Sequence, residues 1–126
     1  MTAMPNDELS ILEIKRLIVD TRKRLDAFGM TEQVVTAPKD YREEALIDVV
    51  FMNVYRILEE ANSLSFDLKS RYSSVPWDEV RGMRNRFAHD YSHVDRVIVW
   101  HTIAHDLSAL ESVADDYIAD NGLPNP

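Results

Sequence analysis

The sequence predicts an all-α fold, an up-and-down bundle of four to five helices of which two are long. Apolar residues recur at steps of three and four positions through most of the 126 residues, as they do on one face of a helix. No alternating strand pattern of useful length interrupts them, and the chain has no internal repeat or low-complexity segment. Helical segments of this kind favour an architecture of helices packed on helices.

The first helix is expected from about Leu9 to Phe28. Its apolar stripe comprises Ile11, Ile14, Ile18, Leu25 and Phe28, with Thr21 in the gap. The stretch from Asn6 to Glu8 offers N-cap candidates, and Gly29 is typical of the residue that follows a helix end. Residues 30–39 have no helical period, so we expect a connecting loop there.

A long second helix is expected from Asp40 to about Arg71. Asp40, followed three residues later by Glu43, resembles a capping box. One apolar stripe contains Leu46, Val50, Asn53, Ile57, Ala61, Leu64 and Leu68, and a second contains Ile47, Phe51, Val54 and Leu58. The first half of this helix is therefore apolar over too wide a face for one neighbour. Either two helices of its own bundle or one helix and a second subunit must cover it.

Two further helices complete the bundle. The third follows Ser73, Ser74 and Pro76, which break the second, and it carries Val80, Met83 and Phe87. The fourth begins after Asp95 and continues to about Ala119. Its stripe is Val97, Trp100, Ala104, Leu107, Ala114 and Tyr117, with Leu110 close by. We expect one domain over residues 1–126, with short flexible tails at about 1–6 and 121–126.

Composition excludes several classes of protein and of site. A formal charge of −8 excludes a generally basic nucleic-acid wrapper. The absence of cysteine excludes disulfides, thiol nucleophiles and thiolate zinc sites, and it suits a reducing compartment. No run approaches the ~20 apolar residues that span a bilayer, and no signal peptide is recognisable. A cytoplasmic protein that does not enter a membrane is the expectation.

The segment from Arg81 to His89 is the one concentrated positive patch, since it holds Arg81, Arg84 and Arg86 and no acidic residue. A guanidinium such as that of Arg84 can bind a phosphate with two hydrogen bonds and stabilise charge that builds on it. The imidazole of His89 can take a proton from a ribose 2′-hydroxyl or give one to the leaving oxygen. This pair therefore suits phosphodiester cleavage without a metal.

Helical geometry complicates this pairing. A spacing of five residues turns about 140°, so Arg84 and His89 do not share a face, whereas Asn85 and His89, four apart, do. Two resolutions exist. Either the helix loosens before His89, or two copies of the motif meet across a dimer interface.

The stretch from Val75 to Tyr91, with Val94, Asp95, Val99 and Trp100 after it, resembles the signature of the HepT-like toxins of the HEPN superfamily. Their pattern is Arg-Asn, three residues, His, one residue and Tyr, preceded by a Pro-Trp helix start and Gly-Met. The resemblance implies a HEPN-type helical bundle that dimerises, with both motifs in one cleft. It implies a metal-independent endoribonuclease toxin of a type II/VII-like toxin–antitoxin pair. By this resemblance Arg84 binds and polarises the scissile phosphate, His89 is the acid or base, and Asn85 supports the site.

The resemblance also implies a partner, a minimal nucleotidyltransferase antitoxin that adds adenylates to the motif tyrosine. That tyrosine is Tyr91 here, and a phosphate ester on it would put negative charge and bulk two residues from His89. Arg81 and Arg86 are candidates for further contacts with RNA, and no cofactor is expected. A second function, from another class, is a catalytically inactive helical bundle that binds a nucleotidyltransferase or presents a substrate to it.

Three positions depart from the family pattern. The family's Gly-Glu-Ala element corresponds to the stretch from Leu58 to Ala61, where the glutamate is Glu59 and the glycine is replaced by Leu58. His93 stands where a small residue follows the motif tyrosine, and Ser108 where a proline is common.

One pair of histidines has a spacing that could suit a metal site. His101 and His105 are four apart on one helix face, but no obvious third ligand accompanies them. We expect an ordinary surface or interface pair and no metal site.

Overall fold

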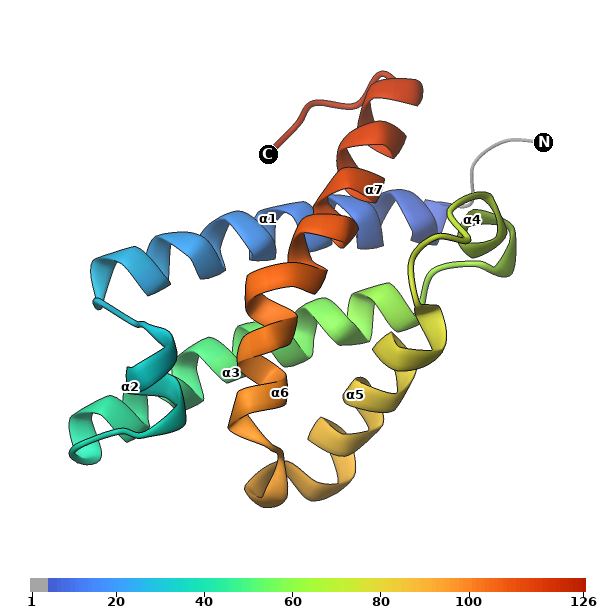
Figure 1. Ribbon diagram of the computed structural model, residues 1–126. Coiled ribbons are helices and arrows are strands. Elements are labelled where there is room, and N and C mark those ends of the chain that lie inside the picture. The colour runs from blue at the N-terminus through green and yellow to red at the C-terminus, as the bar shows by residue number, and fades with distance from the viewer. Residues whose placement is uncertain (1–4) are drawn as a thin grey trace.

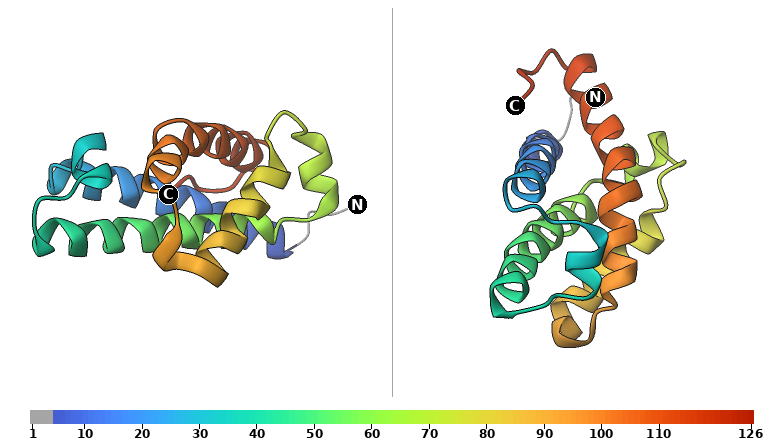
Figure 2. Two further views of the ribbon diagram at one scale, coloured as in Figure 1. Left: turned by 60° about the horizontal axis from the view of Figure 1, so that its bottom comes forward. Right: turned by 60° about the vertical axis from the view of Figure 1, so that its left-hand side comes forward.

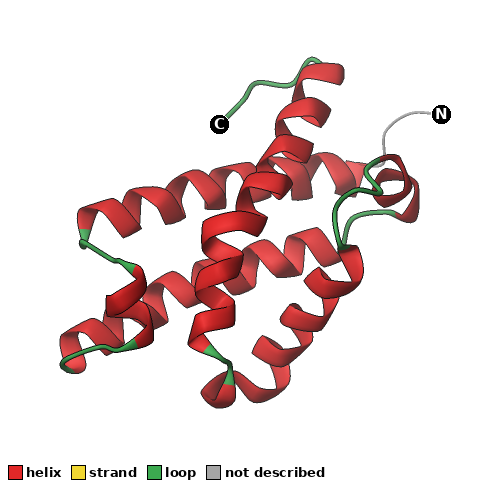
Figure 3. Cartoon of the chain, in the orientation of Figure 1, coloured by secondary structure: helices red, strands yellow, loops and turns green. Residues whose placement is uncertain are grey.

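The computed structural model describes residues 5–126, and these residues form helices joined by short connections (Figures 1 and 3). The α-helices are α1 (Pro5–Ala27), α2 (Glu32–Thr36), α3 (Tyr41–Asn62), α4 (Phe66–Arg71), α5 (Trp77–Asp90), α6 (Arg96–His101) and α7 (Leu107–Asp120). A 3₁₀ turn, Tyr91–His93, follows α5, and a π-helical turn, Thr102–Asp106, joins α6 to α7. No strand occurs among residues 5–126, and the predicted all-α fold is confirmed. Most of the expected tail at residues 1–6 lies outside the described residues.

Helix α3 lies at the centre of the bundle, between α1 on one side and α5 on the other (Figures 1 and 2). Helix α7 packs across α1, and α6 contacts the short α2. The wide apolar face of α3 is covered within the chain, because the following six side chains are each at most 1% exposed: Ile47, Val50, Phe51, Val54, Ile57 and Leu58. Of the two ways to cover this face, the structure shows the one with two helices of the same bundle.

The second helix ends earlier than predicted. Helix α3 begins after Asp40, whose side chain accepts a hydrogen bond from the Glu43 amide at 2.9 Å as expected, but it stops at Asn62. Ser65 then caps a separate helix, α4, and the buried carboxylate of Asp7 accepts hydrogen bonds from the Ser65 amide at 2.9 Å and hydroxyl at 2.5 Å. The break is therefore stabilised by a contact with α1 that the local sequence does not specify.

The predicted loop at residues 30–39 contains a helix of five residues, α2. Thr31 caps it by accepting a hydrogen bond from the Val34 amide at 3.3 Å, and Val35 is fully buried. One buried valine is too few to give the helical period on which the prediction depended. The spacing of apolar residues therefore does not reveal this helix, although the chain is helical there.

The predicted stripe of the last helix is wrong in its first half. Val97 is 58% exposed and Ala104 is exposed, whereas Val99 and Ile103 are buried. The cause is the π-helical turn at Thr102–Asp106, which holds about one residue more than an α-helical turn and so rotates the residues before it relative to those after it. After the turn the predicted positions Leu107, Leu110, Ala114 and Tyr117 are all buried.

The chain turns back after α7. Gly122 adopts a φ of +61°, a conformation that residues with a Cβ rarely adopt. Leu123 then packs against the core, and Asn125 donates a hydrogen bond to Asp115 Oδ1 at 3.1 Å. Within residues 5–126, none of the helices combines the length and the apolar character that a membrane span requires.

Candidate active site

Two of the predicted site residues lie on one seam between α3 and α5. Along α3, Asp48, Tyr55 and Glu59 fall on one line of the helix, and they face Tyr91, Phe87 and Arg84 respectively. We call these six residues the α3–α5 seam. Two of the three pairs are polar and lie at its ends, and the third is an aromatic stack between them.

At one end of the seam, Arg84 is held by two side chains. Its Nε donates a hydrogen bond to the Glu59 carboxylate, and its Nη1 donates to Asn85 Oδ1 at 3.0 Å. The Arg84 side chain is 30% exposed, and within residues 5–126 its Nη2 has no hydrogen-bond partner. The guanidinium is thus oriented by protein groups, while one nitrogen remains available for an anion.

At the other end, Tyr91 donates a hydrogen bond from its hydroxyl to Asp48 Oδ1 at 2.6 Å. Burial, followed by this carboxylate, raises the pKa of the Tyr91 phenol well above its usual range. The hydroxyl therefore keeps its proton at neutral pH. Tyr91 is 39% exposed and is the first residue of the 3₁₀ turn after α5, so one side of its ring faces solvent.

An aromatic layer separates the two polar pairs. The Phe87 ring stacks on Tyr55 with centroids 6.0 Å apart, meets Phe51 edge-on at 5.9 Å and lies 5.9 Å from Tyr91. Burial, followed by the Glu59 carboxylate, raises the pKa of Tyr55. Because Phe87 contacts Tyr91 and its stacking partner Tyr55 lies beside Glu59, the layer connects the surroundings of Tyr91 to those of Arg84.

His89 lies away from this seam, on the outward face of α5. It is exposed, and within residues 5–126 it forms no hydrogen bond or ion pair. Helix α5 stays α-helical through Asp90, so the helix does not loosen before His89, and that predicted resolution is wrong. In one chain Arg84 and His89 therefore point in directions about 140° apart. Asn85 lies one turn before His89 on the same face, as predicted.

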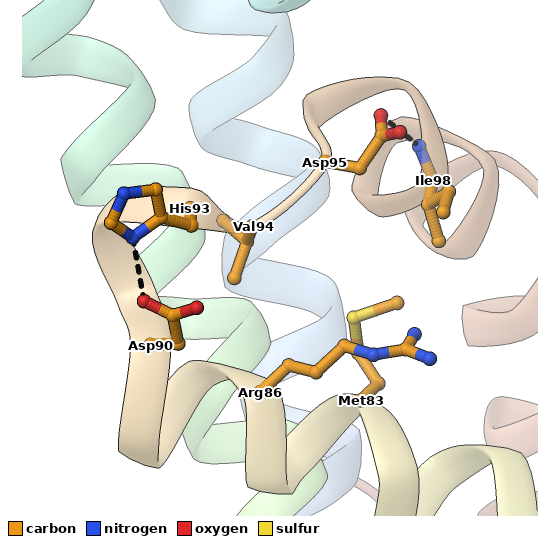
Figure 4. A pocket seen from close by; sticks show the side chains of 7 residues that line it. All are labelled: Met83, Arg86, Asp90, His93, Val94, Asp95 and Ile98. Atoms are coloured by element: carbon orange, nitrogen blue, oxygen red, sulfur yellow. Dashed lines mark hydrogen bonds and ion pairs between the residues drawn. The ribbon is translucent and has the colours of Figure 1, made fainter.

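Arg81 and Arg86 lie on different sides of α5. Arg81 donates a hydrogen bond from Nη2 to Asp78 Oδ1 at 3.0 Å, and both side chains are largely exposed. Arg86 lines a hollow of about 280 Å³ between α5 and the start of α6 (Figure 4). At one edge of this hollow His93 Nδ1 contacts Asp90 Oδ1 at 2.6 Å. The three arginines of the predicted positive patch thus lie in three different environments and do not form one cluster.

Of the three positions that depart from the family pattern, one is buried and two are exposed, and the histidine pair is exposed as well. Leu58, which replaces a glycine, is 1% exposed in the core. His93 and Ser108 are both exposed. His101 and His105 are exposed too, with ring centroids 4.5 Å apart, and within residues 5–126 no group of three or more potential ligands could hold a metal ion.

Sequence reasoning missed Asp48 and Tyr55 as members of the site and gave Glu59 no partner. A signal for them exists, because polar or amphipathic side chains at steps of seven and four residues lie on one line of α3. What the sequence does not show is that this line faces α5. Asp48 and Tyr91 are 43 residues apart, and Glu59 and Arg84 are 25 apart.

Comparisons with known proteins place this site in context. The family described as Ribonuclease HepT-like matches residues 15–117, which include the whole segment from Arg84 to Tyr91. "Putative RNase TTE0752" of Caldanaerobacter subterraneus subsp. tengcongensis is 31% identical over 74 residues, which are 58% of this chain and 66% of that protein. "Putative RNase MJ0125" of Methanocaldococcus jannaschii is 25% identical over 101 residues, which are 75% of this chain and 87% of that protein. "Probable ribonuclease HepT" of Thermococcus cleftensis is 30% identical over 53 residues, 42% of this chain and 48% of that protein. No solved structure gives a significant match.

Proposed function

The chain belongs to the ribonuclease HepT-like family, and from this premise we propose that it is a metal-independent endoribonuclease that acts as the toxin of a toxin–antitoxin pair. The observation that carries the proposal is the state of Arg84, whose guanidinium is oriented by Glu59 and Asn85 and keeps Nη2 available. An arginine held in this way can bind a non-bridging phosphate oxygen without reorganising first.

The proposed reaction is an internal transesterification of RNA. The ribose 2′-oxygen attacks the adjacent phosphorus and loses its proton to a base, while the bond from phosphorus to the 5′-oxygen breaks and that oxygen gains a proton from an acid. The products are a 2′,3′-cyclic phosphate and a 5′-hydroxyl end. His89 supplies one of these proton transfers, and Arg84 stabilises the charge that builds on the phosphate.

A dimer is part of the proposal, because one chain directs Arg84 and His89 to different faces of α5. Two copies that pack α5 against α5 would bring the arginine of one chain toward the histidine of the other. Sedimentation velocity of the purified protein, with activity measured at the same concentrations, tests this arrangement. A strict monomer with full activity would contradict it.

Expression of the chain alone in a bacterium tests the proposed function. We expect growth arrest and loss of cellular RNA, both abolished by Arg84→Ala or His89→Ala and retained by the matched controls Arg42→Ala and His105→Ala, which lie outside the motif. The purified protein should cut RNA in the presence of a chelator and leave cyclic phosphate ends. Harmless expression of the wild-type chain, together with no cleavage in vitro, would instead favour the inactive partner of a nucleotidyltransferase.

We further propose that a nucleotidyltransferase antitoxin inactivates the protein by adding adenylate to the Tyr91 hydroxyl. Tyr91 is the first residue of the turn that follows α5 and its ring is partly exposed, which makes the hydroxyl reachable once it leaves Asp48. Co-expression with a minimal nucleotidyltransferase should add adenylate mass that disappears in Tyr91→Phe and remains in Tyr41→Phe, a change at an 88% exposed tyrosine. An unchanged mass of the wild-type chain would rule out this modification.

A further inference from the structure

A second hollow, of about 720 Å³, lies between α4 and the beginning of α5, and its walls include Asn62, Phe66, Lys69, Trp77 and Arg81 together with the acidic residues Asp78 and Glu79. We call it the α4 hollow. Asn62 lies one helical turn beyond Glu59 on α3, and Arg81 lies one turn before Arg84 on α5. The hollow therefore continues the α3–α5 seam past the Arg84 end, at a distance of about 5 Å along each helix.

Lys69 and Arg81 are the two basic residues of the α4 hollow, and Lys69 is the one of them that no carboxylate holds in an ion pair within residues 5–126. Its ammonium donates a hydrogen bond to the Asn62 carbonyl oxygen at 2.9 Å and lies 5.9 Å from the centroid of the Trp77 ring. Within residues 5–126 it forms no ion pair with a carboxylate. Burial, followed by the positive charge of Arg81, lowers the pKa of Lys69. A partly buried cation that faces a second cation stabilises an anion, and here Lys69 does so against the negative charge of Asp78 and Glu79 in the same walls.

Arg81, the second cation, is not committed to its present partner. Its ion pair with Asp78 joins side chains that are 62% and 92% exposed, and exposed pairs of this kind contribute little stability. An anion bound at Lys69 could therefore recruit the guanidinium at small cost. The ammonium of Lys69 also retains donors beyond the one used for Asn62.

Aromatic side chains flank these cations. Trp77 is fixed, because its Nε1 donates to the carbonyl oxygens of Lys69 and Tyr72, each at 3.1 Å. Phe66, at the rim of the hollow, is 82% exposed although it is among the most apolar of residues. An exposed aromatic ring beside two cations is the arrangement with which proteins bind single-stranded nucleic acid, since bases stack on the ring while cations hold the phosphates.

We propose that the α4 hollow is a subsite for single-stranded RNA, in which Lys69 and Arg81 hold a backbone phosphate and Phe66 stacks on a neighbouring base. This subsite rests on the proposed ribonuclease function, and it places the RNA strand along the seam from the hollow to Arg84. It also supplies affinity at a position away from the bond that is cut, so a long RNA gains contacts that a dinucleotide lacks.

Binding of a fluorescently labelled single-stranded RNA to the His89→Ala protein tests the subsite, because this background does not cut the probe. Phe66→Ala should raise Kd at least about fivefold, since stacking on an aromatic ring contributes about 1 kcal/mol or more per base. Lys69→Gln should lower the slope of log Kd against log salt concentration by about 0.7, the value for one phosphate contact on a single strand. Lys69→Arg should restore most of that slope.

Matched controls remove the same groups elsewhere. Lys23 lies near the C-terminal end of α1 and Phe28 directly follows that helix, and both residues are exposed. Lys23→Gln and Phe28→Ala should leave Kd and its salt slope unchanged. The subsite is overturned if Lys69→Gln and Phe66→Ala behave like these controls, even when the wild-type chain cuts RNA. It is also overturned if the two changes weaken binding to a nucleotidyltransferase and not to RNA. Loss of RNA binding in these variants, in a wild-type chain that cuts no RNA, would support the subsite and refute the proposed function.

Discussion

The hydroxyl of Tyr91 donates a hydrogen bond to Asp48 Oδ1 at 2.6 Å and thereby ties the turn after α5 to the first half of α3. This contact keeps the tyrosine ring against Phe87, 5.9 Å between centroids, and keeps the turn beside His89 in place. A modification of the hydroxyl would bring a negatively charged phosphodiester against the Asp48 carboxylate. The contact cannot survive that change, so the ring and the turn would have to move.

Replacement of Asp48 by Asn should lower the pKa of Tyr91. A carboxylate beside a phenol disfavours the phenolate, so removing its charge makes ionisation easier, while burial still raises the pKa above the usual value near 10. Absorbance of the phenolate during an alkaline titration, with the Tyr91→Phe signal subtracted, measures the shift. Asp26→Asn, at an exposed position of α1, serves as the control. An unchanged titration would show that Asp48 does not contact the hydroxyl in solution.

Replacement of Glu59 by Gln should reduce RNA cleavage about tenfold with little change in unfolding free energy. The amide keeps the size of the side chain but removes the charge that orients Arg84. Arg84→Ala should reduce cleavage by about 100- to 1000-fold, as does loss of one group that stabilises charge in the transition state. Glu60→Gln, the neighbouring acidic residue, is the control. Activity equal to wild type in Glu59→Gln would mean that Arg84 needs no such support.

Restoring the family's glycine at position 58 should destabilise this chain. Leu58 is 1% exposed, so Leu58→Gly leaves a cavity and places glycine inside a helix, with a combined loss of about 3–5 kcal/mol in unfolding free energy. Met52→Gly, on the same helix but at a 54% exposed position, should lose only about 1 kcal/mol. Urea unfolding followed by circular dichroism compares the two. Similar losses in both would show that Leu58 contributes no packing.

Lys15 should govern part of the acid stability. Its ammonium lies 2.8 Å from Glu111 Oε2 and 3.0 Å from Asp115 Oδ1, across the contact between α1 and α7. The hydrogen bond from Lys15 lowers the pKa of Asp115. A carboxyl whose pKa is lowered by folding stabilises the protein above its unfolded value near 3.9, and this contribution is lost as the pH falls through the folded pKa.

Lys15→Met should therefore lower the free energy of unfolding at pH 7 by only about 1 kcal/mol, because the Asp115 side chain is 45% exposed and solvent screens the ion pair. Between pH 5 and pH 3 the free energy of unfolding should fall less in Lys15→Met than in wild type. Urea unfolding at the three pH values measures both effects. Lys23→Met, an exposed lysine that forms no ion pair within residues 5–126, is the control. An acid dependence that is the same in Lys15→Met and wild type would contradict the role of this contact.

Hydrophobic spacing predicted the helices well where one helix packs along one line. The stripes of α1 and α3 are buried as expected at Ile14, Ile18, Val50 and Ile57, because regular helices repeat their faces. The predicted end of α3 was wrong because Asp7, 58 residues before Ser65, accepts a hydrogen bond from the amide of Ser65, the residue that caps α4. The π-helical turn had no local signal, since its extra residue is accommodated by packing and not by a glycine or a proline.

The candidate site was predictable only in part. The motif in α5 and the turn after it predicts Arg84, Asn85, His89 and Tyr91 as site residues, because all four lie in one short stretch of sequence. Their partners on α3 were not predictable from spacing, since the pairing depends on how two helices lie across each other. Nor does the sequence tell that Lys69 lacks a carboxylate partner, because that is a property of the folded surface.

The π-helical turn between α6 and α7 has a consequence for how the length of this chain can vary. A turn that holds one surplus residue is equivalent to a single-codon insertion in an otherwise regular helix, and here it falls at Thr102–Asp106 with Ala104 exposed. Deleting that one residue would restore a continuous α-helix while Val99 and Leu107 keep a common face. Removal of one residue from this turn should therefore shorten the chain while α6 and α7 keep the same faces toward the core.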